Sequence, residues 1–190
     1  AFGARQIKEE KKQPKYINSP ETLLYIKSDI LYGLYQSKNE IRKEDKCYLV
    51  EGYTDVISLY QIGINNVVSS SGTSLTTGQI KLLSRYTKNI TILFDGDEAR
   101  LNASLRGMDL ILENDLNVKI VSLPKNEDPD SLSKKMNESE FKNYLNSNET
   151  DLINYKVKLL NENYKDDPIK KSDMIFDIVK SISKIPNSIK

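Results

Sequence analysis

Two aspartates that follow an apolar run are the residues of this chain best suited to chemistry. The run covers residues 90–94 and reads Ile-Thr-Ile-Leu-Phe, and Asp95 and Asp97 come directly after it, with Gly96 between them. An unbroken apolar run of this length is typical of a buried strand, and a glycine allows the chain to turn sharply. The pattern therefore predicts a buried strand that ends in two carboxylates.

Acids close two other apolar runs in the same way. Glu51 follows residues 48–50, and the pair Asp128 and Asp130 follows the run 118–123. The carboxyl ends of parallel strands share one edge of an α/β sheet, where ligands bind, so we expect all of these carboxylates to converge there. Like charges so close together stay ionised only when cations lie between them. Oxygen ligands without His or Cys favour Mg²⁺ or Mn²⁺, which suggests metal-assisted phosphoryl chemistry.

The strands that must position these acids alternate with helical patterns. Strands are predicted over 47–51, 66–69, 90–94 and 118–123, and helices over 54–61, 76–86 and 98–114. Apolar strands separated by helices indicate a parallel sheet whose two faces are both covered. The predicted fold class is therefore α/β, with a parallel sheet of about four strands flanked by helices.

The segments before this alternation follow other patterns. Residues 1–20 are polar and contain two prolines, which predicts irregular or edge structure. A helix is expected to start at Ser19-Pro20-Glu21 and to run through Leu34, and residues 39–45 are expected to form a charged linker.

After Asp130 the pattern becomes helical. Asp167-Pro168 is a favourable start for the last helix, with the aspartate as N-cap and the proline as first residue. Two apolar stripes are expected to be packing surfaces, and they consist of Ile153, Val157 and Leu160 and of Ile175, Ile178, Ile182 and Ile185.

Composition excludes several kinds of site. The chain has no histidine and one cysteine, which rules out Ser-His and Cys-His catalysis, a His-based zinc site and an intrachain disulfide. Cys47 is expected to be a small core residue, and the lack of a disulfide fits a reducing cytoplasm. The net charge of +1 points to no class of partner, and no apolar run approaches the ~18 residues of a membrane span. The chain starts without Met and without a signal-peptide pattern, so it is read as a piece of a longer protein.

Ordinary structural roles account for some of the acids. Thr54 is expected to be the N-cap of the helix over 54–61, and Asp55 would suit its first turn. Asp97 could cap the next helix, and the segment 128–130 alone would be an ordinary turn. Glu51, before a glycine at a strand end, has no such explanation, and neither does Asp95.

Taken together, the acidic segments resemble the Toprim domain, and further motifs resemble the bacterial replicative primases (DnaG-type). The matching segments lie in the family's order between Gly3 and Leu132, namely 14–22 (PKYINSPET), 31–35 (LYGLY), 51–56 (EGYTDV), 71–76 (SGTSLT), 94–97 (FDGD) and 123–130. The resemblance divides the chain into a remnant of the N-terminal subdomain of the catalytic core (1–44), a Toprim domain (45–135) and a C-terminal helical subdomain (136–190).

This resemblance implies the site residues. Its metal-site acids are Glu51, Asp95, Asp97, Asp128 and Asp130, of which Glu51, Asp95 and Asp97 are the catalytic set, and Asp55 is a supporting acid. Residues that match the family's basic groove for nucleotide phosphates and nucleic acid are Arg5, Lys15, Asn18 and Lys27. The chain departs from the family at Arg100 and at Ala4, where glycine is usual.

It also implies a function. The family synthesises RNA primers from ribonucleoside triphosphates on single-stranded DNA at the bacterial replication fork, in the cytoplasm, using two or more Mg²⁺ or Mn²⁺ ions. Its zinc-binding domain, the earlier half of its polymerase domain and its helicase-binding domain are not in this sequence. Two alternatives stay open: a Toprim nuclease or topoisomerase fragment, and a Toprim module that binds nucleic acid without catalysis. No zinc is expected in this fragment.

Overall fold

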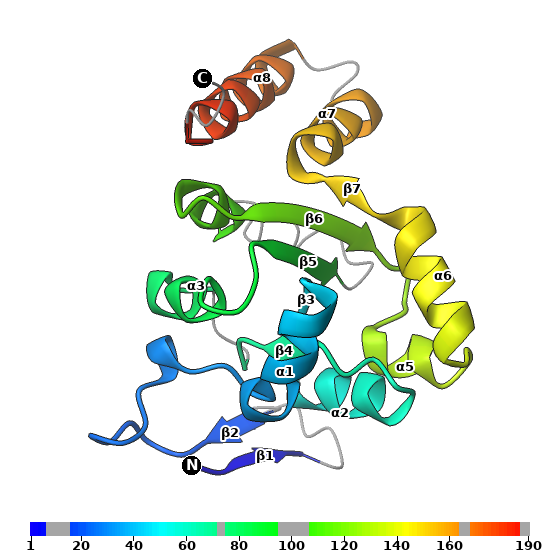
Figure 1. The fold of residues 1–190 in the computed structure, drawn as a ribbon. Coiled ribbons are helices and arrows are strands. Elements are labelled where there is room, and N and C mark those ends of the chain that lie inside the picture. The colour runs from blue at the N-terminus through cyan, green and yellow to red at the C-terminus, as the bar shows by residue number, and fades with distance from the viewer. Residues whose placement is uncertain (7–15, 72–74, 95–106, 164–167, 187–190) are drawn as a thin grey trace.

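A five-stranded sheet forms the centre of the molecule (Figure 1). The computed structural model describes residues 1–6, 16–71, 75–94, 107–163 and 168–186. The strand order is β4-β3-β5-β6-β7, formed by Val67–Ser69, Cys47–Val50, Asn89–Phe94, Asn117–Ser122 and Thr150–Asp151 respectively. The first four of these strands are parallel, and β7 pairs antiparallel with β6.

The four predicted strands are confirmed, each to within one residue at either end. Their side chains alternate between the two faces, since Cys47 and Leu49 join one hydrophobic core while Tyr48 and Val50 join the other. β7 was not predicted, because a two-residue strand of Thr and Asp carries no apolar run. On the other side of the sheet, the backbone of Tyr32 bridges β4 at Ser69.

Helices cover both faces, as predicted for a parallel sheet. The larger core contains residues of α1 (Leu34–Glu44), α3 (Thr77–Leu83), the helical residues 107–113, α7 (Leu152–Asn163) and α8 (Pro168–Ser183). The smaller core contains residues of α2 (Tyr53–Gln61), α5 (Pro129–Ser133) and α6 (Glu138–Asn148). The helix predicted over 54–61 is confirmed, and the one predicted over 76–86 is shorter than expected. Of the segment 98–114, residues 107–113 are helical and the start lies outside the described residues.

The helix predicted from Ser19 through Leu34 is wrong. Near the N-terminus, β1 (Gly3–Arg5) and β2 (Tyr16–Asn18) pair antiparallel as a small hairpin, and residues 7–15 lie outside the described residues. The chain then forms an open loop whose only helical turn is η1 (Lys27–Asp29). Leu23 and Leu24 are 99% and 98% exposed, so the apolar residues that suggested a helix do not face a core.

The linker predicted over 39–45 is wrong as well, because α1 continues to Glu44. Leu34, Ser37 and Ile41 are buried along one side of this helix, so a narrow face of three residues is enough to hold it on the sheet. Helix α1 starts at Leu34 because the preceding Gly33 has a φ of 84°, a left-handed conformation that favours glycine and lies outside the helix. A Cβ at this position would also lie 2.9 Å from Cγ1 of Val56.

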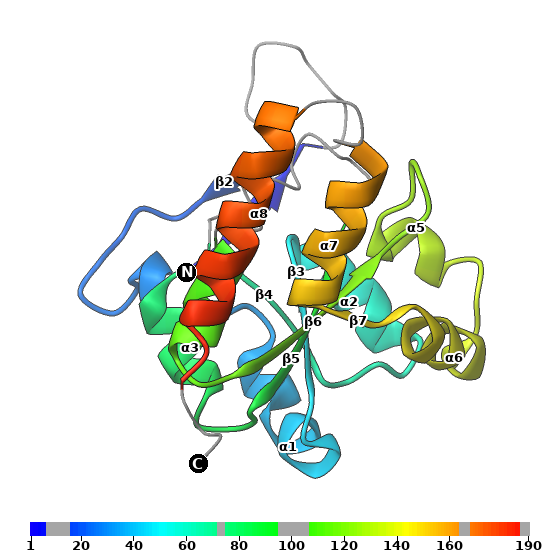
Figure 2. The same cartoon turned by 90° about the horizontal axis from the view of Figure 1, so that it is seen from above.

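The last two helices lie side by side above the sheet (Figure 2). Their buried faces differ from the predicted stripes. In α7 the predicted stripe is buried at Leu160 and packs against the core at Ile153, but Val157 is 38% exposed, and Leu152, Tyr155 and Leu159 are buried as well. In α8, Met174, Ile178 and Ser181 are buried, whereas the remaining isoleucines of the predicted stripe are 44–49% exposed and comprise Ile175, Ile182 and Ile185. The apolar stripe of α8 is thus only partly a packing surface within the described chain.

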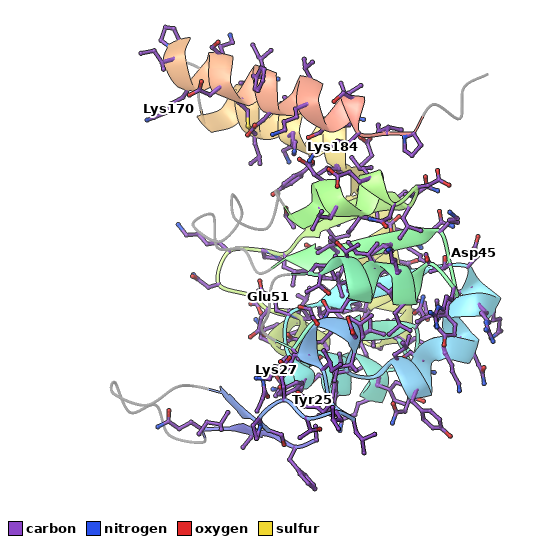
Figure 3. The ribbon with its side chains drawn as sticks, turned by 90° about the vertical axis from the view of Figure 1, so that its left-hand side faces the viewer. Tyr25, Lys27, Asp45, Glu51, Lys170 and Lys184 are labelled. Atoms are coloured by element: carbon purple, nitrogen blue, oxygen red, sulfur yellow. The ribbon has the colours of Figure 1, made fainter. Side chains whose placement is uncertain are left out.

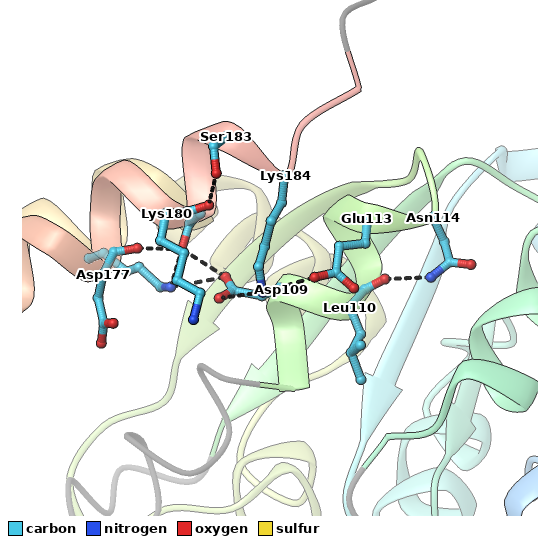
Figure 4. A network of polar contacts seen from close by, with 10 residues as sticks. Asp109, Leu110, Glu113, Asn114, Asp177, Lys180, Ser183 and Lys184 are labelled. Atoms are coloured by element: carbon cyan, nitrogen blue, oxygen red, sulfur yellow. Dashed lines mark hydrogen bonds and ion pairs between the residues drawn. The ribbon is translucent and has the colours of Figure 1, made fainter.

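A buried ionic network joins these helices to the helix over 107–113 (Figure 4). Asp109 Oδ1 accepts a hydrogen bond of 3.0 Å from Lys156 Nζ of α7 and one of 2.8 Å from Ser181 Oγ of α8. Lys184, just after α8, contacts Asp109 at 3.4 Å and Glu113 at 2.9 Å. Lys156 and Asp109 expose only 5% and 12% of their side chains, so each charge depends on the other for compensation.

Two predictions from composition can be compared with the structure. Cys47 is fully buried, as expected for a small core residue, and burial raises the pKa of its thiol. Among the described helices, none has the length and apolar character needed to cross a membrane.

Candidate active site at the carboxyl edge of the sheet

The carboxyl ends of four parallel strands meet at one edge of the sheet, and Glu51 lies there. It directly follows β3, and Figure 3 shows it on the opposite side of the molecule from Asp45, which precedes β3. Ser69 Oγ, at the end of β4, donates a hydrogen bond of 2.8 Å to the backbone carbonyl of Glu51. Because this bond joins the ends of two adjacent strands, it fixes the backbone from which the partly exposed Glu51 side chain projects.

Asp55 lies in the first turn of the helix that follows Glu51. Its carboxylate is buried and accepts a hydrogen bond of 2.9 Å from the backbone N–H of Gly52. The helix begins at Tyr53 with Gly52 as its N-cap, so the prediction of Thr54 as N-cap is wrong by two residues. A carboxylate is favoured at this end of a helix by the exposed N–H groups and the helix dipole. Asp55 therefore stabilises the turn between Glu51 and α2.

The second acidic pair is engaged in local interactions at the start of α5. Asp128 is the N-cap, and its Oδ1 accepts a hydrogen bond of 2.7 Å from the backbone N–H of Ser131. Asp130 accepts a hydrogen bond from Ser58 of α2 and forms an ion pair of 2.8 Å with Lys134. An ordinary turn-and-cap role thus accounts for the geometry of Asp128, while Asp130 connects α5 to α2.

Bases beside this pair are the feature that sequence reasoning missed. Lys134 stands four residues after Asp130 in α5, a spacing that brings side chains together on a helix and could have revealed the pair. Glu127 is paired with Lys135, and this hydrogen bond together with one from Ser131 lowers the pKa of Glu127. Two of the acids after β6, Glu127 and Asp130, are therefore each paired with a lysine.

The convergence of all the predicted acids stays a prediction. Asp95 and Asp97 lie outside the described residues, as do Lys15 and Arg100. Within the described ranges, no group of three or more His, Cys, Asp or Glu side chains is arranged to hold a metal ion. What the structure does describe is Glu51 at the carboxyl edge, a capped turn behind it, and an α5 start that packs against α2.

The predicted phosphate-binding residues come from the hairpin and from the loop after it. Arg5 pairs through its backbone with Tyr16 in the hairpin. Asn18 accepts a hydrogen bond from the Tyr53 hydroxyl at the start of α2. The Tyr53 ring lies 5.0 Å from that of Tyr32, and a Cβ on Gly3 would lie 2.7 Å from the same ring. Tyr53, which sequence reasoning did not single out, thus seats the hairpin on α2.

Lys27 belongs to η1 and lies on the same side of the molecule as Glu51 (Figure 3). Its backbone N–H donates a hydrogen bond of 2.9 Å to Glu21 Oε1, which holds the start of the turn. Its side chain is partly exposed, and no ion pair of its ammonium group is found among the described residues. A cation in this position can meet an anionic ligand at the carboxyl edge.

Comparison with known protein families matches two parts of the chain. Residues 1–38 match a family described as the N-terminal domain of the DNA primase catalytic core, and residues 48–133 match one described as Toprim-like. A curated DNA primase of Clostridium acetobutylicum is 42% identical over 185 residues, which make up 97% of this chain and 30% of that protein. The chain thus spans about a third of the length of the curated relatives it matches.

Solved structures lead to the same family. A DNA primase domain from Pseudomonas aeruginosa superposes with a TM-score of 0.82 at 35% identity, over 97% of this chain and 58% of that one. A DnaG primase catalytic domain bound to single-stranded DNA superposes with a TM-score of 0.80 at 32% identity, over 97% and 60%. The expected α/β fold and the resemblance seen in the sequence motifs are confirmed.

Proposed function

Because the chain is a homologue of the bacterial DnaG-type DNA primases and carries their Toprim-like domain, we propose that it forms the Toprim part of a primase catalytic core. The reaction is the synthesis of RNA primers from ribonucleoside triphosphates on a single-stranded DNA template. The observation that carries this proposal is the superposition of 97% of the chain on a primase catalytic domain bound to single-stranded DNA. Primer synthesis belongs to a polypeptide of the relatives' full length that contains this chain.

We propose that divalent metal ions bind at the carboxyl edge of the sheet. Carboxylate oxygens are the ligands that Mg²⁺ and Mn²⁺ prefer, and the position of Glu51 after β3 fits such a group. The proposed ligands are Glu51, Asp95, Asp97, Asp128 and Asp130. When bound, the ions would activate a primer 3′-hydroxyl and neutralise the departing pyrophosphate. At Asp130 a metal would compete with Lys134, so this residue would bind metal more weakly than its charge alone suggests.

The other proposed site residues would support the metal ligands or position the nucleotide and the template. Asp55 holds the turn behind Glu51 by accepting the N–H of Gly52. The proposed phosphate contacts come from Arg5, Lys15, Asn18 and Lys27, which would orient the nucleotide and the template without reading base sequence. For Asn18, the hydrogen bond from Tyr53 supports a fixed orientation of its side chain.

The proposed organisation places the remnant of the N-terminal subdomain in residues 1–44, the Toprim domain in 45–135 and a helical subdomain in 136–190. The nucleotides, the RNA primer and the replicative helicase are proposed partners of the full-length protein, with the helicase bound by a part outside this sequence. The proposed location is the bacterial cytoplasm, at the replication fork. With no histidine and one cysteine, the chain has no Cys/His set for a structural zinc ion.

A primer-synthesis assay on a full-length primase that contains this chain tests the proposal. Glu51→Ala and Asp95→Ala should each abolish primer synthesis while leaving the fold intact. Asp173→Ala, which removes an exposed aspartate of α8, serves as the matched control and should retain activity. Retained synthesis by Asp95→Ala would contradict the metal-site proposal. A parallel DNA-nicking assay separates the primase from a Toprim nuclease or topoisomerase, and binding without either reaction would indicate a non-catalytic module.

A further inference from the structure

The loop that carries Lys27 has no hydrophobic anchor of its own. We call residues 19–30 the Lys27 loop, and none of them is buried. Leu23 and Leu24 are almost fully exposed, and the loop's internal contacts are polar, including η1, the bridge between Thr22 and Tyr25 and the hydrogen bond from the N–H of Lys27 to Glu21. Its conformation, and with it the direction of Lys27, must therefore depend on contacts with another element.

That element is the start of α3, and the central contact is made by Gln79. This side chain is fully buried. Its Nε2 donates hydrogen bonds to the carbonyl of Lys27 at 3.1 Å and to the carbonyl of Ile30 at 2.9 Å. Its Oε1 accepts the backbone N–H of Thr76 at 3.1 Å. A carboxamide has two donor hydrogens, so Gln79 uses both of them to hold the two ends of η1.

Two neighbours of Gln79 reinforce this contact. The Thr76 hydroxyl donates a hydrogen bond to the carbonyl of Ser28 and also caps α3 by accepting the N–H of Gln79. At Gly78, a Cβ would lie 2.2 Å from Asp29 Oδ1 and 2.8 Å from the carbonyl of Ser28. The absence of a side chain at Gly78 therefore allows η1 to lie directly against α3.

We infer that Gln79 is a positioning residue for Lys27: its buried carboxamide fixes η1 against α3 and thereby directs the Lys27 ammonium toward the carboxyl edge of the sheet. The inference rests on the proposed function, in which Lys27 contacts phosphate. Gln79 itself touches no substrate. Neither the acidic motifs nor the basic residues of the sequence point to it, because its partners are backbone carbonyls about 50 residues away.

Two substitutions test this role in different ways. Gln79→Met keeps the length of the side chain and removes every hydrogen bond. Gln79→Glu keeps an acceptor for the N–H of Thr76, and so keeps α3 capped, but it removes both donors to the Lys27 loop. Gln36→Met is the matched control, because Gln36 is an exposed glutamine of α1.

The readout is binding of single-stranded oligothymidylate to the 190-residue chain, measured by fluorescence anisotropy across a salt series. Lys27→Ala should weaken binding about three- to tenfold and flatten the log–log salt slope by roughly 0.7, the value for one phosphate contact. Both Gln79 variants should reproduce this loss of slope, and adding Lys27→Ala to either should cause no further change. Gln36→Met should leave affinity and slope as in the wild type.

The outcomes separate the two levels of proposal. An unchanged slope in Lys27→Ala would remove the phosphate role of Lys27 from the proposed function. A reduced slope in Lys27→Ala together with a wild-type slope in a folded Gln79→Glu chain would overturn the positioning role of Gln79. If Gln79→Met fails to fold, Gln79→Glu still decides, because it keeps the acceptor for the N–H of Thr76, and a loss of stability alone does not flatten the salt slope of the folded chain by roughly 0.7.

Discussion

Glu51 and Asp130 illustrate how two acids near strand ends can be held differently. Glu51 projects from a backbone that Ser69 fixes, directly after β3. Asp130 lies in the first turn of α5, forms an ion pair with Lys134 and accepts a hydrogen bond from Ser58. A cation that approaches Asp130 must displace the ammonium group of Lys134. Asp130 should therefore contribute less to metal affinity than its charge alone suggests.

Metal binding should stabilise the chain against heat. Adding Mg²⁺ or Mn²⁺ should raise the melting temperature, because a ligand that binds only the folded state shifts the unfolding equilibrium. Asp95→Asn should reduce this rise, and thermal unfolding monitored by circular dichroism measures both effects. Asp173→Asn is the control and should respond to metal as the wild type does. An equal response in Asp95→Asn and the wild type would count against the site.

Glu149, which lies between α6 and β7, connects several strands of the sheet. The Glu149 carboxylate accepts hydrogen bonds from Lys119 of β6 at 3.0 Å and Thr91 of β5 at 3.1 Å, and it also pairs with Lys46. Burial opposes the ionisation of Glu149, but the hydrogen bonds and charges of the two lysines outweigh burial and lower the pKa of its carboxyl from the ordinary value for glutamate. This lowered pKa links the packing of β7 to pH.

Glu149→Gln should reduce the free energy of unfolding by about 1–3 kcal/mol at neutral pH. A carboxylate with a depressed pKa in the folded state stabilises the protein above its unfolded pKa, and this contribution is lost as the pH falls through the folded value. The difference between variant and wild type should therefore shrink well below pH 4.5. Urea unfolding of the variant and the wild type at neutral pH and at acidic pH measures this difference in the free energy of unfolding. Glu138→Gln, which breaks an exposed pair with Lys142, should cost under about 0.5 kcal/mol at either pH.

Helix α8 provides a matched pair of isoleucines that tests its register. Ile178 is 8% exposed and Ile182 is 49% exposed, four residues further along the same helix. Ile178→Ala should lower the free energy of unfolding by about 2–4 kcal/mol, because it leaves a cavity in the larger core. Ile182→Ala should cost less than half as much. Equal losses in urea unfolding would mean that both residues face a core.

Elements defined by their own composition could be predicted from the sequence, and elements defined by their neighbours could not. The four parallel strands could be predicted because an unbroken apolar run indicates a buried strand without information from the rest of the chain. The helix expected through Leu23 and Leu24 failed because apolar residues do not reveal whether a core lies beside them. For the same reason, the predicted stripe of α8 contained exposed isoleucines along with the buried Ile178.

The candidate site shows the same division. Glu51 could be placed at the carboxyl edge because topology alone puts it there. Asp128 caps a helix, whereas the sequence suggested only an ordinary turn over 128–130 as the alternative role. The partners of Asp130, Ser58 and Lys134, were not predicted. Gln79 could not be found, since its role depends on a loop that meets α3 only after folding. The positions of Asp95 and Asp97 remain predictions.

For the molecule as a whole, we expect residues 1–190 alone to be a poor primase. The chain spans about a third of the length of its curated relatives. Holding a template and two nucleotides in reactive geometry can supply ~7–11 kcal/mol of the barrier, and a groove formed by part of a protein forfeits much of this. Primer-synthesis assays should show little or no product, while metal or nucleotide binding should be detectable by calorimetry. A full-length primase that contains this chain is the positive control, and equal turnover by the two would refute this expectation.

The two borders of the sheet bear on how the protein behaves at high concentration. An open border presents a row of unpaired N–H and C=O groups, which can pair with another molecule and start aggregation. Here the Tyr32 backbone occupies the outer side of β4 at Ser69, and β7 occupies the outer side of β6 along Lys119 and Ile120. The two residues of β7 therefore do more than lengthen the sheet. They block part of the longest parallel strand pair from recruiting a second copy, and Lys119 beside them is held by its ion pair with Glu149.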